Sequence, residues 1–466
     1  MIGFMYKVTV NNKIFFAKEG TLLSDIIISS GEVHSQPCGG MGKCKKCTVT
    51  VNGKKELSCQ YKIHSDITVE FSSEQIFSPA VSTCISDIKS DKTVLVLDIG
   101  TTTLALGIVD IKSKRLINVI SDTNPQRVFG SDVMSRIDYC AKHGPESLNK
   151  ILIDKINEMI NSVKEYSFDT LFVAGNTTML HLFFGVDCSS IGNAPYTPVF
   201  LGARTENGKS IGLDSIKTVH SLPSISSFVG ADITAGLNIT DFPENEKYSL
   251  LVDLGTNAEI VLFKKDRLIC TSAAAGPCFE GVNITCGMSA TDGAVCEYRS
   301  GSDYKTVNNK KAKGICATGL IDIIAVLLQN EIIDESGFME SESFRINEDV
   351  FLTRADVRQF QNAKSAIFSG ILTLLTNEGI DFANIEALYV SGGFSEKLNI
   401  ENAVRSGLFP NELKNKFIPL NNSSLLGTAK YAVENNELEY IIKNAVAVEL
   451  AESPCFSELF IENMMF

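Results

Sequence analysis

One short pattern occurs twice in this chain, and it constrains the fold more than any other feature. An apolar strand leads into Asp98-Ile-Gly-Thr-Thr-Thr103, and another apolar strand leads into Asp253-Leu-Gly-Thr-Asn-Ala258. Both copies continue with an alternating strand, a basic turn and a third strand. Residues 94–117 and 250–269 are therefore two versions of one unit, and the chain contains an internal duplication.

The segments that follow the two copies are also alike. Apolar residues recur in them with the period of a helix or of a strand. This periodicity predicts helices at 148–163, 320–329 and 354–377, and strands at 170–174 and 387–390. Three strands followed by alternating helices and strands thus occur twice. This order predicts two α/β subdomains, about 93–245 and 246–466, with a nucleotide cleft between them.

The repeated turn contains the residue types that phosphate binding requires. Its glycine lets the backbone approach a phosphate, and its hydroxyls and N–H groups donate to phosphate oxygens. Its aspartate can hold Mg²⁺, usually through water. The predicted cofactor-binding residues of the two turns are Gly100, Thr101, Thr102, Thr103, Gly255, Thr256 and Asn257.

Four carboxylates are candidates for catalytic roles. Asp98 and Asp253 are predicted to position Mg²⁺ and water, although capping carboxylates would look the same in sequence. Glu259 and Glu280 are candidates for a general base or for groups that bind Mg²⁺-bound water, with a purely structural carboxylate as the alternative. His181 lies in an apolar context and is predicted to be a packed histidine.

The two turns resemble the first and second phosphate motifs of the acetate and sugar kinase, Hsp70 and actin superfamily. Ser391-Gly-Gly-Phe-Ser395 is similar to the adenosine motif of that superfamily, and Leu426-Gly-Thr-Ala-Lys-Tyr431 is similar to its closing helix. In isolation, residues 391–393 would be an ordinary strand-to-helix turn. The resemblance implies a duplicated α/β actin-like ATPase fold that binds ATP and Mg²⁺, with Gly392 and Gly393 against the adenosine.

Four cysteines near the N-terminus have the spacing C-x5-C-x2-C-x11-C: Cys38, Cys44, Cys47 and Cys59. The first three lie on one loop that is rich in glycine, and the fourth follows a predicted hairpin. Three thiolates on a loop and a distant fourth are the arrangement of a ferredoxin [2Fe–2S] centre. A zinc site also uses four thiolates but usually contains two C-x2-C pairs, and here only Cys44 and Cys47 form one.

The cysteine segment belongs to a small N-terminal unit. Strands at 6–10, 13–16, 47–51 and 67–71 and a short helix at 21–30 predict an α+β ferredoxin-like β-grasp domain over residues 1–71. Polar residues 72–92 are predicted to be a linker. The other nine cysteines are scattered and are predicted to be small buried hydrophobes.

Charge and hydropathy exclude several functional classes. The net charge is −13, which disfavours binding to nucleic acid or to anionic membranes. Residues 1–70 carry nine lysines and six acidic residues, so a small basic domain precedes an acidic one. Its lysines could steer an acidic partner or simply form a solvated face. The chain lacks a run of 18 apolar residues and a signal peptide, so we expect a cytoplasmic protein.

A ferredoxin-like domain fused to this ATPase fold resembles the reductive activators of corrinoid proteins. Residues 174–181, 230–233 and 274–281 are also similar to segments of that family. The resemblance implies ATP-dependent transfer of one electron, received from an upstream low-potential reductant, to inactive Co(II) in a corrinoid protein of a methyltransferase system. This transfer restores Co(I). The resemblance also implies a homodimer. Larger members carry a further domain where residues 72–92 lie, so a homodimer of this chain would have to form without the contacts attributed to that domain.

Two other hypotheses fit parts of the sequence. An activator of a radical dehydratase has a similar ATPase but uses a [4Fe–4S] cluster at a dimer interface. A non-enzymatic redox-sensing scaffold would bind ATP with negligible turnover. The complete Asp and Thr set in both turns disfavours the scaffold.

Overall fold

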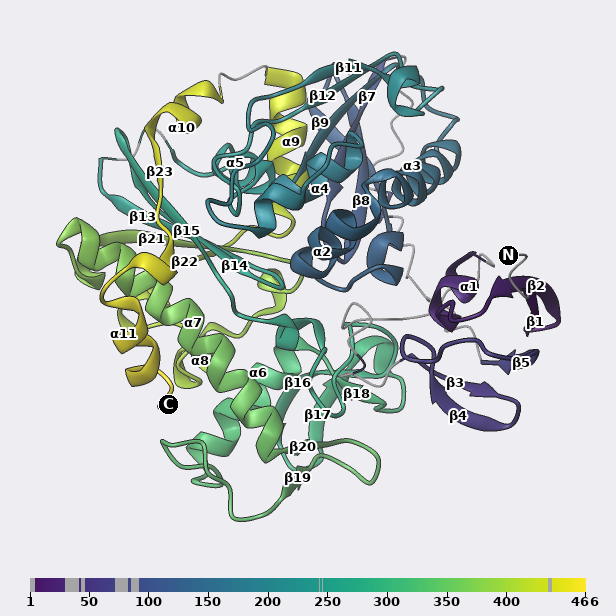
Figure 1. Ribbon diagram of the computed structural model, residues 1–466. Helices are drawn as coiled ribbons and strands as arrows, with labels where there is room; N and C mark the ends of the chain where they lie inside the picture. Colours follow the sequence, from purple (N-terminus) through teal and green to yellow (C-terminus); the bar gives the residue numbers. More distant parts are fainter. Residues whose placement is uncertain are drawn as a thin grey trace. The chain divides into compact units, whose positions relative to one another are not determined.

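The computed structural model describes residues 5–29, 42, 47–71, 83–84, 92–242, 244, 246–434 and 438–466. By its contacts the chain divides into two compact units, Met1–Ser221 and Leu222–Phe466 (Figure 1). The first unit contains the small N-terminal domain and the first copy of the duplicated turn, and the second unit contains the second copy. Of the four clustered cysteines, Cys38 and Cys44 lie outside the described residues.

The N-terminal domain is a five-stranded mixed sheet with one helix, α1 (Leu23–Ser29). Its strands are β1 (Met5–Val10), β2 (Lys13–Lys18), β3 (Thr48–Val51), β4 (Lys54–Leu57) and β5 (Ile67–Glu70), in the order β2-β1-β5-β3-β4. Strands β1 and β5 pair in parallel, β2 forms an antiparallel hairpin with β1, and the β3–β4 hairpin pairs antiparallel with β5. This is the predicted β-grasp arrangement. Asn11, Asn12 and Asn52 adopt the positive φ angles that tight hairpin turns require.

The sheet of the first ATPase half has seven strands, in the order β11-β12-β10-β7-β8-β9-β6. They are β6 (Thr83–Cys84), β7 (Thr93–Ile99), β8 (Thr103–Asp110), β9 (Arg115–Thr123), β10 (Thr170–Gly175), β11 (Thr205–Asn207) and β12 (Thr218–Ser221). Strands β7, β8 and β9 are antiparallel, whereas β10 pairs in parallel with β7 and β12 pairs in parallel with β10.

The second unit repeats this arrangement in a sheet of order β22-β21-β13-β14-β15-β23. Its strands are β13 (Tyr248–Leu254), β14 (Ala258–Lys264), β15 (Arg267–Ala273), β21 (Ile385–Ser391), β22 (Phe417–Pro419) and β23 (Ala445–Ala447). Here too three antiparallel strands are followed by two parallel ones, β21 and β22. The five strands β12-β10-β7-β8-β9 therefore correspond to β22-β21-β13-β14-β15, which confirms the predicted duplication.

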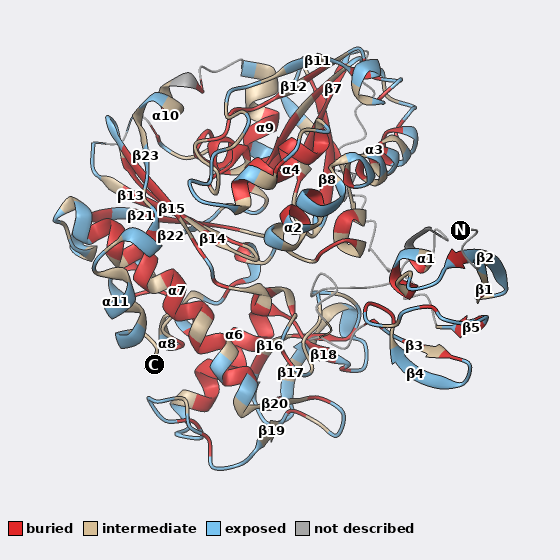
Figure 2. Cartoon of the chain, in the orientation of Figure 1, coloured by how far each residue is buried: buried red, intermediate tan, exposed pale blue. Residues whose placement is uncertain are grey.

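Two smaller sheets complete the second unit. One contains β16 (Ala294–Ser300), β17 (Asp303–Thr306) and β18 (Gly314–Ile315), and the other contains β19 (Ser343–Arg345) and β20 (Phe351–Thr353). Figure 2 shows that buried residues concentrate in the strands of the two large sheets and on α6 and α7.

The helices of the first unit after α1 are α2 (Val133–His143), α3 (Glu146–Asn161) and α4 (Thr177–Phe183). Those of the second unit are α5 (Ala231–Leu237), α6 (Ala317–Gln329), α7 (Arg354–Glu378), α8 (Ile400–Arg405), α9 (Ser423–Glu434), α10 (Glu439–Asn444) and α11 (Phe456–Glu462). The longest, α7, starts at a capping box formed by Thr353 and Asp356 and ends at Gly379, which has a φ of 65°.

The predicted segments agree with these elements, with two corrections. Part of the predicted linker is a strand, because β6 pairs antiparallel with β9 at the edge of the first sheet. The helix α2 was not predicted, since its sequence interrupts the apolar period with polar residues such as Ser135 and Asp138. The helix α5 precedes the predicted subdomain boundary near residue 245 but packs on α9 in the second unit.

None of the helices in the described part of the chain combines the length and the hydropathy that a membrane span requires. The scattered cysteines are mostly buried, as predicted: Cys140, Cys188, Cys270, Cys278 and Cys316 are buried, while Cys286, Cys296 and Cys455 are half-buried.

Candidate functional site

The first repeated turn links β7 to β8 through Gly100 and the three threonines that follow. The Gly100 N–H donates to the Thr103 carbonyl oxygen over 3.0 Å, and a Cβ at position 100 would lie 2.7 Å from that oxygen. Only glycine closes this turn without moving it. Asp98 lies on β7 just before the turn and is half-buried. Its register partners are Ala174 on β10 and Ala105 on β8.

Buried polar side chains fix the first turn from behind. Arg136 of α2 is fully buried, and its Nη2 donates to the Thr101 carbonyl oxygen. Its Nε donates to the Gly130 carbonyl oxygen over 3.0 Å. Asn124, also fully buried, donates from Nδ2 to the Gly100 carbonyl oxygen over 2.8 Å. The backbone of the turn is thus held in one conformation before any ligand binds.

Asn176 contacts the Thr101 side chain of the first turn. It caps α4, and its Oδ1 accepts from the Met179 N–H over 2.9 Å. Its Nδ2 donates to the Thr101 hydroxyl oxygen over 3.2 Å. Sequence reasoning missed Arg136, Asn124 and Asn176. The sequence signals for Asn176 were its position two residues after a predicted strand and its place in the segment 174–181, which resembles a segment of a known family.

The second turn links β13 to β14 through Gly255, Thr256 and Asn257. The Gly255 N–H donates to the Asn257 carbonyl oxygen over 2.9 Å, so this turn is one residue shorter than the first. Because of that difference, the residue opposite Asp253 is Glu259, and its equivalent in the first copy is Ala105. A gapless alignment of the two copies would have paired Glu259 with Leu104 instead.

A row of polar side chains crosses the sheet of the second unit at this level. Asp253 is in register with Ser391 on β21 and with Glu259 on β14, and Glu259 is in register with Ser272 on β15. The Ser272 hydroxyl donates to Oε1 of Glu259 over 3.0 Å. Burial of the Glu259 carboxyl group, together with the negative charges of Asp232 and Asp253, raises its pKa well above the ordinary value.

Glu280 is brought to the second turn by the segment 274–281. This segment ends in a 3-10 helix, η4 (Pro277–Glu280), and in Gly281, whose φ is 76°. A side chain on Gly281 would collide with the backbone of Met288. The Thr256 hydroxyl donates a short hydrogen bond to Oε1 of Glu280. The structure therefore brings together the predicted carboxylates of this unit: Asp253 and Glu259 are paired by strand register, and Glu280 contacts Thr256 in the turn that joins their strands.

The predicted adenosine motif follows β21 in the same unit. Gly392 has a φ of 110°, and a Cβ there would overlap the Leu254 carbonyl oxygen, so the chain passes directly over the end of β13. The hydroxyls of Ser391 and Ser423 lie 2.6 Å apart, which joins this turn to the first residue of α9. Gly393 is exposed beside them. The predicted closing helix at 426–431 is part of α9.

The two described cluster cysteines lie side by side. Cys47 immediately precedes β3 and Cys59 follows β4, and both are buried. Their Sγ atoms are 3.2 Å apart, too far for a disulfide bond of about 2.05 Å. Burial, followed by the hydrogen bond with Cys47, raises the pKa of Cys59 to about 11. Two buried, adjacent thiols fit a soft metal centre of the predicted kind.

Metal binding at either place stays a prediction. In the part of the chain that the structure describes, no group of three or more His, Cys, Asp and Glu side chains is arranged to hold a metal ion. The carboxylate oxygens of the second turn fit Mg²⁺, which takes few protein ligands and keeps several waters. His181 is fully buried, its Nδ1 lies 2.7 Å from the Thr177 carbonyl oxygen, and it is a packed histidine as predicted.

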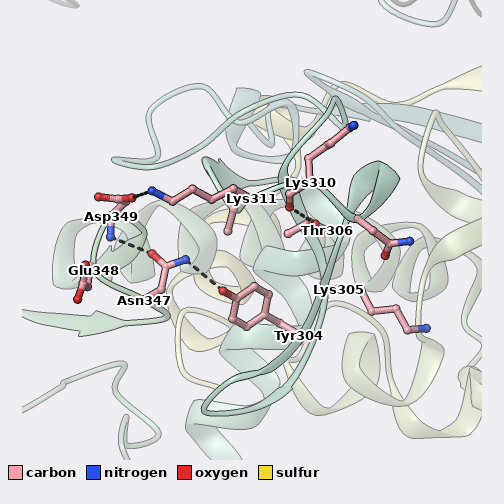
Figure 3. Close-up of a pocket in the computed structure, with 10 residues that line it drawn as sticks. Tyr304, Lys305, Thr306, Lys310, Lys311, Asn347, Glu348 and Asp349 are labelled. Carbon is pink, nitrogen blue, oxygen red and sulfur yellow. Dashed lines mark hydrogen bonds and ion pairs between the residues drawn. The ribbon is translucent and has the colours of Figure 1, made fainter.

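A hollow of about 550 Å³ lies elsewhere in the second unit, between β17 and the loop at 347–349 (Figure 3). Lys311 in its wall pairs with Asp349 over 2.8 Å, and Asn347 donates to the Tyr304 hydroxyl over 3.2 Å. Its lining contains none of the residues predicted to bind ATP or metal. We assign it no role.

Known proteins resemble this chain over most of its length. Residues 93–245 match the RACo middle region, and residues 247–466 match the C-terminal domain of RACo, the ASKHA domain. The corrinoid activation enzyme RamQ of Eubacterium limosum is 29% identical over 579 aligned residues, which cover 96% of each protein. This alignment is longer than the chain, so RamQ carries residues that have no counterpart here.

Two further proteins are similar. The Co(II) methylated amine-specific corrinoid protein reductase of Methanosarcina barkeri is 26% identical over 410 residues, which cover 79% of this chain and 76% of the relative. A solved structure of a reductive activator for a corrinoid, iron–sulfur protein has 25% sequence identity and a TM-score of 0.73. That match covers 99% of this chain and 98% of the other.

Proposed function

Because this chain belongs to the RACo family of reductive activators of corrinoid proteins, we propose that it returns the inactive Co(II) state of a corrinoid protein to Co(I) in an ATP-dependent reaction. The observation that carries this proposal is the similarity to a corrinoid activation enzyme over 96% of both chains. Similarity of that extent includes the N-terminal domain as well as the ATPase halves.

The residues proposed to bind ATP are those of the two turns and of the adenosine motif. Thr101 and Thr256 lie on turns that glycine closes tightly, and Gly392 lies where the end of β13 leaves no room for a side chain. Asp98 and Asp253 are proposed to hold Mg²⁺ through water, and Mg²⁺ would neutralise phosphate charge there. The role of Asp253 is further supported by its place beside Glu259 in the polar row.

The electron is proposed to come from a [2Fe–2S] cluster held by Cys38, Cys44, Cys47 and Cys59, which would have a reduction potential of about −400 mV. Cys47 and Cys59 support this assignment because their thiols are both buried and lie next to each other. Each 100 mV of uphill transfer costs about 2.3 kcal/mol for one electron. ATP can offset such a cost only by favouring a state that the resting protein rarely adopts.

The test is a visible-light titration of a Co(II) corrinoid protein from a methyltransferase system, in the presence of the anaerobically reconstituted protein and a low-potential reductant. We expect the Co(I) spectrum to appear with ATP and not without it. The Asp253→Asn variant should bind its cluster normally but lose the effect of ATP. A protein that reduces no such partner in response to ATP, or that binds no adenine nucleotide, would contradict the proposal.

A further inference from the structure

We propose that the two duplicated turns bind opposite charges: the Thr101 hydroxyl donates to a phosphate oxygen of ATP, whereas the Thr256 hydroxyl offers its oxygen to hydrated Mg²⁺. Asn176 and Glu280 are the positioning residues that set these roles. The inference rests on the proposed ATP binding and goes beyond it, because the two turns look equivalent in sequence.

In the first turn, the Thr101 hydroxyl group has its hydrogen available to donate to a ligand. The amide of Asn176 has only one orientation, since its Oδ1 accepts from the Met179 N–H over 2.9 Å. Its Nδ2 must therefore donate to the Thr101 oxygen, 3.2 Å away. A hydroxyl has one hydrogen and two acceptor lone pairs, so the Thr101 hydrogen is left to point elsewhere. Among the described residues, the structure provides no acceptor for that hydrogen.

In the second turn, the Thr256 hydroxyl group can only accept from a ligand. Its Thr256 hydroxyl donates to Oε1 of Glu280, and a carboxylate can only accept. The single hydrogen of Thr256 is therefore engaged, and its oxygen presents lone pairs. Such an oxygen attracts a cation or a water that donates to it, and it does not attract a phosphate oxygen. The proposal therefore departs from the simpler expectation that both threonines donate to phosphate.

The charges around each turn favour the same division. Each turn follows an aspartate, Asp98 or Asp253, but the first turn also has the buried guanidinium of Arg136 behind it, which donates to the Thr101 carbonyl oxygen. The second turn instead has a further carboxylate, Glu280, which contacts Thr256. Negative potential of this kind disfavours a bare phosphate and favours a hydrated divalent cation.

The first half of the inference is tested by the affinity of the full-length protein for ATP. Asn176→Asp keeps the cap of α4, because Asp caps as well as Asn, but it turns the donor into an acceptor that captures the Thr101 hydrogen. We expect the Kd for ATP to rise about tenfold, as it should in Thr101→Val. Asn207→Asp, the same change at an exposed cap of a 3-10 helix, is the matched control and should leave Kd unchanged.

A double-mutant cycle separates this effect from simple charge repulsion. If Asn176→Asp acts through the Thr101 hydroxyl, the double variant with Thr101→Val should bind about as weakly as either single variant. Additive losses would mean that the new charge repels ATP directly, and that result would overturn the role of Asn176.

The second half is tested by the Mg²⁺ dependence of binding, measured as the ratio of Kd in excess chelator to Kd in excess Mg²⁺. Glu280→Gln supplies an amide that can donate to Thr256, as Asn176 does to Thr101, so we expect the ratio to fall about tenfold. Thr256→Val should also lower this ratio, without a change of charge. Glu386→Gln is the control, because Glu386 forms an exposed ion pair with Lys247, and it should leave the ratio unchanged. The first-turn variants should leave this ratio unchanged.

Equal losses with and without Mg²⁺ in Glu280→Gln and Thr256→Val would overturn the assignment to Mg²⁺. A native protein that binds no ATP would instead reject the proposed function itself. A native protein that binds ATP while all four first- and second-turn variants behave like it would reject only the division between the turns.

Discussion

At the residue scale, the two copies differ most at position 259. The second copy has a carboxylate where Ala105 stands in the first, because its turn is one residue shorter. Glu259 accepts from Ser272 and lies beside Asp253 and Asp232. A strand pairing, and not the sequence motif, thus gives one half of a duplicated fold a group that the other half lacks.

The raised pKa of Glu259 predicts a pH dependence of stability in protein freed of metal. Between the ordinary pKa of 4.5 and the higher folded value, the folded state binds more protons than the unfolded state. The free energy of unfolding should therefore decrease as the pH rises through this window. Glu259→Gln, which mimics the protonated group, should remove that part of the decrease when urea unfolding is followed from pH 4.5 upwards.

The reverse result, a native protein that gains stability over the same window relative to Glu259→Gln, would show that the carboxylate is stabilised in its charged form. Glu342→Gln serves as the control, because Glu342 lies exposed in an ion pair with Arg354.

At the scale of elements, the packing of α5 against α9 joins the closing helix to its unit. Gly427 of α9 lies so close to Ala235 of α5 that a Cβ would overlap the Ala235 carbonyl oxygen. Two further contacts reinforce this approach: Asn238 Nδ2 donates to the Gly427 carbonyl oxygen over 3.1 Å, and Lys430 Nζ donates to the Asn238 carbonyl oxygen over 2.8 Å. The same helix supplies Ser423 to the adenosine motif.

This packing predicts that Gly427→Ala is destabilising, although alanine favours helices by about 1 kcal/mol over glycine. We expect a loss of about 1–3 kcal/mol in the free energy of unfolding, because backbone must move to admit the methyl group. Gly370→Ala in α7 is the comparison, since its Cβ would come within 2.6 Å of the end of the flexible Ile260 side chain and would meet no backbone atom closely. A Gly427→Ala variant as stable as Gly370→Ala would contradict the close approach.

At the scale of the whole molecule, the proposed reaction divides two tasks between parts of the chain: the N-terminal domain binds the cluster and the ATPase halves bind ATP. We therefore expect loss of the cluster to leave ATP binding unchanged. Cys59→Ser should abolish the visible spectrum of the reconstituted cluster and the reduction of Co(II), because it removes a thiolate ligand. Its affinity for ATP should equal that of the native protein. Cys455→Ser, at a half-buried cysteine beside α11, should change neither property.

Asp253→Asn should give the complementary result, with a native cluster spectrum and no ATP-dependent reduction. If Cys59→Ser also lost ATP binding, the two functions would not be separable in the way that the domain organisation predicts.

The sequence by itself determined the duplication, the two glycine turns and the β-grasp domain. These features depend on residues adjacent in the chain, such as the apolar periodicity before Asp98 and Asp253 and the positive-φ turn at Asn11 and Asn12. Local patterns of this kind specify strands and tight turns because their causes are steric and act over a few residues.

Only the tertiary structure decided which polar side chain contacts the threonine hydroxyl of each turn. Asn176 reaches Thr101 from 75 positions away in the sequence, and Glu280 reaches Thr256 from 24 positions away. The pairing of Glu259 with Asp253 depends on the exact length of a turn. A threonine hydroxyl can donate or accept with equal ease, so its role is set by whichever distant side chain the fold places beside it.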